Sequence, residues 1–211
     1  MAIDDVSAPS RQVDPAVGND LDPAVGNDLE VDVLIVGAGP VGMLGGILAS
    51  RHGLSVAVLE RRDGPQTAPA AHVVNARTYE ICRQAGLNME RIFAAGKDPA
   101  DAGHVNFVTR LTGELIGRLP FERQGDACLD HTPTPLRNLS QHRFEPILAD
   151  ELRASPGAEL RYRHQWQESH EVTVDGTTTV VSEVTDLTSD STLTVRSRFL
   201  IGCDGAGSRV R

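Results

Sequence analysis

Two apolar runs, separated by a helical pattern, form the most regular part of this 211-residue sequence. The run VDVLIV at 31–36 is rich in β-branched residues and ends at a glycine loop, which predicts a buried parallel strand. Residues 40–52 carry apolar side chains at helical spacing, and Gly53 is placed to end that helix. The run SVAVLE at 55–60 predicts a second strand, so the three segments together predict a βαβ unit.

The rest of the chain combines helical and alternating patterns. A Pro/Ala loop at 61–72 precedes a predicted helix at about 76–85. A further helix is predicted at 141–154, where Pro146 is tolerable only in the first turn. Alternating patterns predict a hairpin at 104–119 and strands at 171–187 and 191–202. These elements predict an α/β fold, namely a Rossmann-like parallel sheet with an added antiparallel β layer.

The acidity of the chain is concentrated at its N-terminus. The first 30 residues hold seven acidic residues and Arg11, which accounts for −6 of the formal net charge of −9. Residues 1–29 also contain the octapeptide DPAVGNDL twice, at 14–21 and 22–29. This composition predicts a disordered tail, and a replication slip is the favoured origin of the repeat. Because no basic patch accompanies it, a nucleic acid is not expected as a partner.

The cysteines and histidines show no metal-ligand spacing. Cys82, Cys128 and Cys203 are widely separated, so neither a metal site nor a disulfide framework is expected, and a cytoplasmic location is predicted. His164 and His170 lie in a polar stretch and are expected to be exposed. No apolar run reaches the length of a membrane span, and no secretory signal opens the chain, so no membrane association is expected.

A glycine-rich loop lies directly between the first strand and the first helix. The candidate dinucleotide-binding residues of this loop are Gly37, Gly39, Pro40, Val41 and Gly42. The first glycine permits a tight turn, the second lets the backbone approach a pyrophosphate, and the third allows close helix–strand packing. The N-terminus of the helix then offers free N–H groups to a phosphate. This context predicts a dinucleotide-binding site but does not separate FAD from NAD.

Two acidic residues at strand ends complete the candidate chemistry. Glu60 ends the second strand, where its carboxylate can accept hydrogen bonds from both hydroxyls of an adenosine ribose and would repel a 2′-phosphate. Asp204 and Gly205 follow the apolar strand at the chain's C-terminal end, in the segment RFLIGCDGAGSRVR at 198–211. There the aspartate can bind a polyol, and a plain Asp-Gly turn is the alternative.

Several segments together resemble one known family, the FAD-dependent aromatic hydroxylases of the phenol and para-hydroxybenzoate hydroxylase class, and especially the bacterial phenol-type monooxygenases. That family shows a dinucleotide motif, an RAH..N.RT.E segment, a glutamine-bearing helix and a GCDG..S.VR segment, in this order. The matching segments are VLIVGAGPVG at 33–42, AHVVNARTYEICRQAGL at 71–87, LSQHRFEPIL at 139–148 and LIGCDGAGSRVR at 200–211.

The resemblance implies a role for each matching residue. The glycines of the loop would hold the FAD pyrophosphate, while Glu60 and Arg61 would face the adenosine side. Gln141 would lie along the flavin side, and Asp204 with Gly205 would bind the ribityl chain. Ala70 departs from the family, which has a phosphate-side arginine there, and loss of that contact could weaken FAD by roughly 1.5–3 kcal/mol.

The resemblance also implies the reaction, in which NADH or NADPH reduces the FAD and O2 hydroxylates an aromatic substrate. Residues 30–211 would form the FAD-binding domain, with the hairpin at 104–120 belonging to a partial substrate-domain sheet. The substrate domain is then incomplete, so the isolated chain is expected not to hydroxylate, and no catalytic residue is assigned. A homo-oligomer or a downstream C-terminal polypeptide are the expected partners. A non-catalytic FAD-binding remnant and a flavin-dependent reductase or dehydrogenase without oxygen activation remain the alternatives.

Overall fold

The computed structural model describes residues 28–121 and 128–211, so most of the tail predicted at 1–29 lies outside the described residues. Leu29, the last residue of that predicted tail, instead begins a strand. The described part is built on a six-stranded sheet with the strand order β7-β2-β1-β10-β9-β8. The first four of these strands are mutually parallel, and β10, β9 and β8 are joined antiparallel. In this order the strands span Ala158–Tyr162, Val56–Glu60, Leu29–Val36, Ser191–Gly202, Thr177–Asp186 and His164–Val174. The prediction of a parallel sheet with an antiparallel layer is therefore confirmed.

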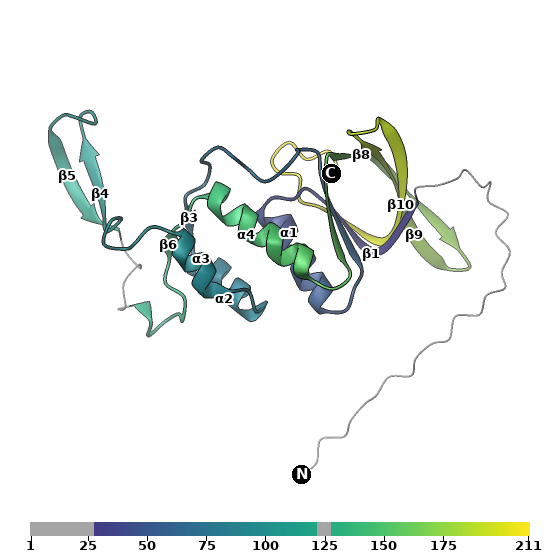
Figure 1. Ribbon diagram of the computed structural model, residues 1–211, viewed down its shortest axis with the longest axis horizontal. Helices are drawn as coiled ribbons and strands as arrows, with labels where there is room; N and C mark the ends of the chain where they lie inside the picture. Colours follow the sequence, from purple (N-terminus) through teal and green to yellow (C-terminus); the bar gives the residue numbers. More distant parts are fainter. Residues whose placement is uncertain (1–27, 122–127) are drawn as a thin grey trace, which may run out of the picture.

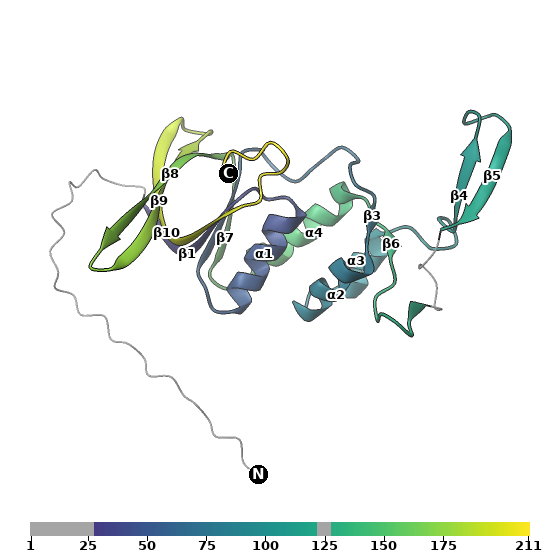
Figure 2. The ribbon, with the colours of Figure 1, turned by 180° about the vertical axis from the view of Figure 1, so that it is seen from behind.

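Helices cover one face of the parallel strands. In Figures 1 and 2, α1 (Pro40–Arg51) and α4 (Gln141–Ala154) lie side by side against this face, with α2 (Ala76–Gln84) and α3 (Met89–Ala95) beyond α4. Alternate residues of β1 and β2 point to these helices, and together with them they form the larger core. Its fully buried members include Ile35, Val56, Val58, Met43, Ile47, Leu148 and Leu152.

The opposite face of the sheet has a smaller core of its own. Leu34 and Leu59 point away from the helices because side chains alternate along a strand. They pack there against Val184 of β9 and Val195 of β10, so the antiparallel strands close over this face. The parallel strands are consequently buried on both sides, as their uninterrupted apolar runs indicated.

The structure differs from the expected elements in several places. The strand β7 and the helix α3 were not foreseen, and β8 begins at His164 where the alternation predicted a start at 171. Pro146 is the sixth residue of α4, beyond the first turn, so its ring cannot donate a hydrogen bond to the carbonyl of His142. The apolar face of α4 is deeply buried, and that packing maintains the helix across the missing bond.

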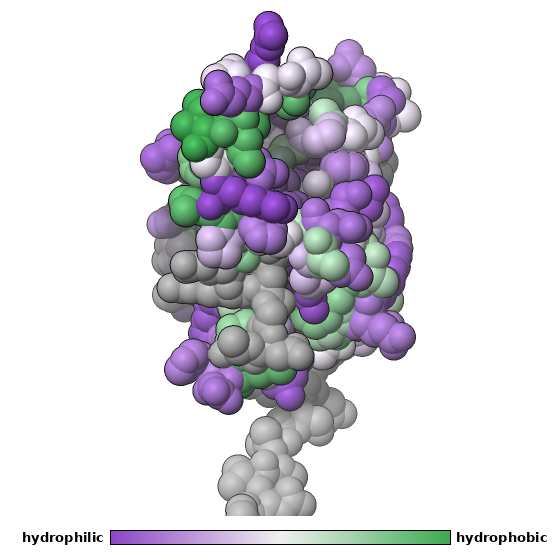
Figure 3. Space-filling view, turned by 90° about the vertical axis from the view of Figure 1, so that its left-hand side faces the viewer, coloured by the Kyte–Doolittle hydropathy of each residue, from purple (hydrophilic) through white to green (hydrophobic). Residues whose placement is uncertain are grey.

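A β-hairpin projects from the helical end of the molecule. It consists of β4 (His104–Val108) and β5 (Leu115–Pro120), as predicted, and a shorter antiparallel pair joins β3 (Val73–Val74) to β6 (Arg137–Asn138). Figure 3, viewed from the hairpin end, shows green hydrophobic surface beside purple hydrophilic side chains. The large apolar side chains of the hairpin are exposed, namely Val105, Phe107, Val108, Leu111, Leu115, Ile116 and Leu119. Among the described residues, no helix is both long and apolar enough to cross a lipid bilayer.

Candidate cofactor-binding site

A cleft of about 400 Å³ lies at the carboxyl ends of the central parallel strands. Three segments that are distant in sequence meet there, because β1 ends at the glycine loop, β2 ends at Glu60 and β10 leads into Asp204. In open α/β sheets this edge is the usual place for a ligand. Seven of the predicted site residues line the cleft: Gly37, Gly39, Glu60, Arg61, Gln141, Asp204 and Gly205.

The glycine loop has the geometry that its sequence predicts. Gly37 has a φ of 104°, which side chains rarely allow, and a Cβ there would overlap the carbonyl of Cys203. A Cβ on Gly42 would overlap the carbonyl of Gly37, so the helix could not approach the turn as closely. At Gly39, in contrast, a Cβ would meet no protein atom within 4 Å. The loop is therefore closed on its protein side and open on its cleft side.

The other two residues of the predicted motif do not line this cleft. Pro40 begins α1 and lines a second, smaller cavity of about 170 Å³, which Gln141 also lines. Val41 is exposed and lies outside both cavities. The N-cap residue Gly39 contributes no side-chain hydrogen bond to the first turn of α1. Of the predicted loop residues, Gly37 and Gly39 thus line the cleft, Pro40 lines the smaller cavity, and Val41 and Gly42 line neither.

Glu60 is nearly buried, with 8% of its surface exposed, and its carboxylate is already engaged. Oε2 accepts a hydrogen bond from the backbone N–H of Ala38 at 3.1 Å, and Oε1 accepts one from the N–H of Arg62 at 3.0 Å. The guanidinium of Arg62 adds an ion pair at 3.1 Å. Burial alone would raise the pKa of Glu60, but these hydrogen bonds outweigh it and the pKa is lowered. Glu60 is therefore a carboxylate that also holds the glycine loop in place.

Asp204 presents one satisfied and one unsatisfied oxygen. Oδ2 accepts a hydrogen bond from the N–H of Arg209 at 2.7 Å. Oδ1 is buried and has no partner among the described residues. Burial raises the pKa of Asp204, but the hydroxyl of Ser208 and backbone N–H groups outweigh it, so the pKa is lowered. A buried carboxylate oxygen without a partner is costly, which makes it a ready acceptor for a ligand hydroxyl.

The chain is similar to known FAD-binding proteins over most of its length. The model of the FAD binding domain family matches residues 30–211. The chain belongs to this family. It is 36% identical over 187 residues to the 2,4-dichlorophenol 6-monooxygenase of Cupriavidus pinatubonensis, covering 86% of this chain and 30% of that protein. Phenol 2-monooxygenase of Pseudomonas sp. (strain EST1001) is 31% identical over 186 residues, with the same two coverages.

Solved structures agree with this family membership. The flavin-dependent monooxygenase PieE, in complex with FAD and substrate, superposes with a TM-score of 0.76 at 31% sequence identity. The match covers 87% of this chain and 32% of that one. A ternary complex of aklavinone-11 hydroxylase with FAD and aklavinone gives a TM-score of 0.75 at 29% identity. The chain thus spans about 30% of the length of the curated relatives it matches.

Some residues of this FAD-binding domain's cleft were missed from the sequence. Arg62, Glu145, His164 and Trp166 all line it. The prediction that His164 is exposed is wrong, because the residue is half-buried and its Nδ1 lies 2.8 Å from the carbonyl oxygen of Tyr162. His170 is exposed, as expected. Glu145 could have been recognised in the sequence as a charged residue within the apolar face of the predicted helix at 141–154.

Two of the three cysteines, Cys82 and Cys203, have a thiol pKa that burial raises. Burial raises the pKa of the Cys203 thiol, and the neighbouring Asp204 carboxylate raises it further. Cys82 is fully buried, and burial raises the pKa of its thiol to about 11. Within the described residues no cluster of metal-ligating side chains occurs. The cleft thus offers polar groups for a dinucleotide, while its thiol at Cys203 stays protonated and unreactive.

Proposed function

We propose that this chain is the FAD-binding part of a monooxygenase that hydroxylates a phenolic or other aromatic substrate with NADH or NADPH and O2. The observation that carries the proposal is the convergence of Gly39, Glu60 and Asp204 at one edge of the sheet, although Asp204 lies more than 140 residues beyond the other two in the sequence. The relatives named above are monooxygenases of phenols, and PieE was solved with FAD.

The residues present fit FAD. The open side of Gly39 leaves room for a pyrophosphate against the backbone, next to the N-terminus of α1. The unpartnered Oδ1 of Asp204 suits a hydroxyl of the ribityl chain, with Gly205 beside it. Gln141 lines both cavities, which supports its proposed place along the flavin side. When bound, FAD supplies the redox chemistry with the nicotinamide cofactor and oxygen.

The adenosine end requires one adjustment. Both oxygens of Glu60 already accept hydrogen bonds, and the Arg62 guanidinium contributes to this saturation. Ribose hydroxyls can therefore bind Glu60 only if the Arg62 guanidinium releases one of its contacts with this carboxylate. Arg62 has other partners at hand, since Nη1 donates to Oε1 of Gln66 at 2.8 Å. Arg61 is exposed at the rim of the same cleft, where it can flank the adenosine.

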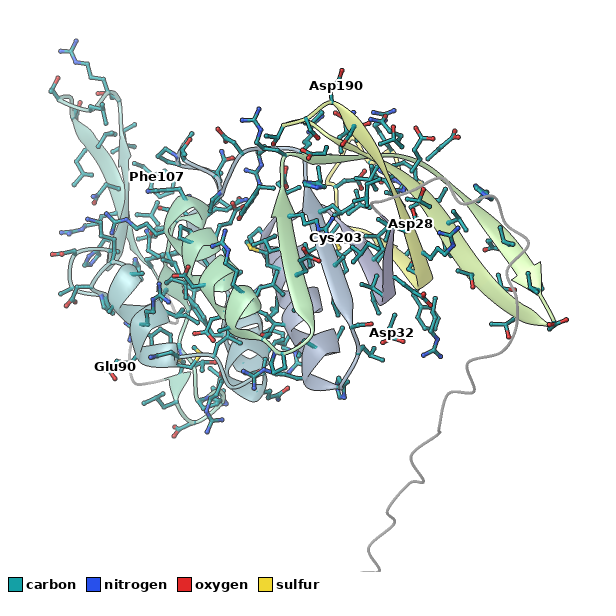
Figure 4. The ribbon with its side chains drawn as sticks, turned by 45° about the vertical axis from the view of Figure 1, so that its right-hand side comes forward. Asp28, Asp32, Glu90, Phe107, Asp190 and Cys203 are labelled. Atoms are coloured by element: carbon teal, nitrogen blue, oxygen red, sulfur yellow. The ribbon has the colours of Figure 1, made fainter. Side chains whose placement is uncertain are left out.

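The hairpin of β4 and β5 is proposed to belong to a substrate-domain sheet. Its two strands expose apolar side chains on a projecting ribbon, and in Figure 4 Phe107 lies well away from Cys203 and the cleft. An isolated two-stranded ribbon is marginally stable in water, so it needs a sheet or another surface to pack on.

A reducing, cytoplasmic location is proposed from the absence of any disulfide at Cys82 and Cys203.

Cofactor binding and substrate-dependent turnover test this function separately. The purified chain is titrated with FAD and, in parallel, with NAD, following flavin fluorescence and equilibrium dialysis. Retention of FAD in preference to NAD is expected, and retention of NAD alone would overturn the cofactor assignment. Consumption of NADH or NADPH is then measured with a panel of phenols. Consumption that yields only hydrogen peroxide is the expected result for this chain by itself, whereas a hydroxylated product would overturn the expectation that the isolated chain does not hydroxylate.

A further inference from the structure

A buried carboxylate on α4 has no role in the binding scheme above. Glu145 lies in the second turn of the helix, and none of its surface is exposed. Its neighbours in sequence, Phe144 and Ile147, belong to the apolar core. Burying an ionised carboxylate is expensive unless it is paired and hydrogen-bonded, so its partners define what it does.

The two oxygens of Glu145 hold different parts of the cleft wall. Oε1 accepts a hydrogen bond from Nε2 of Gln141 at 2.6 Å, one helical turn earlier. Oε2 accepts one from the backbone N–H of Gln66 at 2.5 Å, in the loop that follows β2. The guanidinium of Arg62 lies 3.7 Å from Oε2 and supplies the compensating positive charge. Glu145 therefore joins the adenosine-side loop to the glutamine on the flavin side.

The contact with Gln141 determines which way its amide is turned. A carboxylate has only acceptor atoms, so the NH2 group of the glutamine must face Glu145. Oε1 of Gln141 is then left without a hydrogen-bond partner among the described residues, in a side chain that lines both cavities. Without Glu145 the amide could equally present its NH2 group to the cleft, which would exchange an acceptor for a donor.

We propose that Glu145 is a positioning residue that holds Gln141 with its carbonyl oxygen toward the cofactor, as an acceptor for a hydroxyl or N–H group of FAD. The inference rests on the proposed FAD site. It adds that Gln141 acts in this site as a hydrogen-bond acceptor and not as a donor. Glu145 itself need not touch the cofactor, because it acts through the Gln141 amide.

The test compares Glu145→Gln, Gln141→Leu and the double variant in FAD titrations. Glutamine keeps the shape of Glu145 but turns part of the acceptor into a donor, so Gln141 loses its fixed orientation. We expect each single variant to bind FAD 5- to 20-fold more weakly, roughly the value of one hydrogen bond. The double variant is expected to bind no more weakly than Gln141→Leu alone, since both changes remove the same contact.

A matched control and the overturning results follow from the same titrations. Glu151→Gln removes a charge from the same helix outside the cleft and should leave FAD affinity unchanged. Wild-type affinity in Glu145→Gln would overturn the proposal, as would effects that multiply in the double variant. The flavin absorption spectrum is expected to shift in Glu145→Gln and not in Glu151→Gln.

A measurement on the unsubstituted protein covers the case in which Glu145→Gln does not fold. The side-chain amide signals of Gln141, assigned in a 15N–1H NMR spectrum by their loss in Gln141→Leu, should exchange slowly with solvent in the FAD-free protein. Rapid exchange, as for an exposed glutamine, would overturn the proposal. If the wild-type chain binds no FAD, the proposed function fails, while this spectrum still reports whether Glu145 holds Gln141.

Discussion

Gly39 gives the sharpest test of the cofactor site, because an alanine there should separate binding from stability. The residue has a φ of −74° and a ψ of 179°, which alanine adopts freely, and an added Cβ meets no protein atom within 4 Å. Replacing glycine by alanine at a helix N-cap lowers the free energy of unfolding by up to about 1 kcal/mol. Alanine also restricts the unfolded chain, which raises the free energy of unfolding by about 0.4–1 kcal/mol and largely offsets that loss. We therefore expect the melting temperature of Gly39→Ala to stay within about 2 °C of wild type.

FAD binding should respond quite differently to the same methyl group. On the cleft side, the Cβ would occupy the space where the backbone must approach the pyrophosphate. Losing one charge-assisted hydrogen bond from the loop corresponds to about 1.5–3 kcal/mol. The dissociation constant for FAD in Gly39→Ala should then rise roughly 10- to 100-fold.

Two neighbouring glycines supply the comparison. Gly45→Ala lies inside α1, where its Cβ would be 3.7 Å from Cδ1 of Ile35, so it should raise stability by about 0.5–1 kcal/mol and leave FAD binding alone. Gly37→Ala should unfold the loop, since both its φ and the Cys203 carbonyl oppose a side chain. Melting is followed by circular dichroism without FAD, and binding by quenching of flavin fluorescence. Wild-type FAD affinity in a normally stable Gly39→Ala protein would refute the placement of the pyrophosphate.

Three further predictions address the rest of the molecule. Asp204→Ala removes the acceptor for a ribityl hydroxyl and should weaken FAD about 10- to 100-fold in the same titration; an unchanged affinity would remove Asp204 from the site. Burial raises the pKa of Cys82 from about 9 to about 11, so the folded state holds this proton more tightly than the unfolded chain. The free energy of unfolding should consequently fall between pH 9 and 11, by up to about 3 kcal/mol, and urea titrations of Cys82→Ala should lack that part of the fall. Phe107→Ser, on the projecting hairpin, should change neither FAD affinity nor melting temperature appreciably; a weaker FAD complex would show that the hairpin contributes to the site.

The sequence alone was sufficient for the parts of the site whose chemistry is local. The loop at 37–42 combines a strand, a tight turn and a helix N-terminus within a few residues, so spacing by itself predicts its shape. Glu60 and Asp204 were predictable for the same reason, since each directly follows or ends an apolar run. The structure brings them to one cleft because β2, β1 and β10 are parallel neighbours, a pairing that short-range patterns do not specify.

Tertiary structure alone decided which other residues join them. Arg62 and Gln66 meet Glu145 only because the loop after β2 packs on α4, almost 80 residues later. His164 enters the cleft because β7 pairs with β2, although its own surroundings in the sequence are polar. The burial of Glu145 follows from the packing of α4 and not from its residue type, which is almost always exposed. The glycine loop and the strand-end acids therefore follow from local backbone geometry, while the network that orients Gln141 depends on long-range packing.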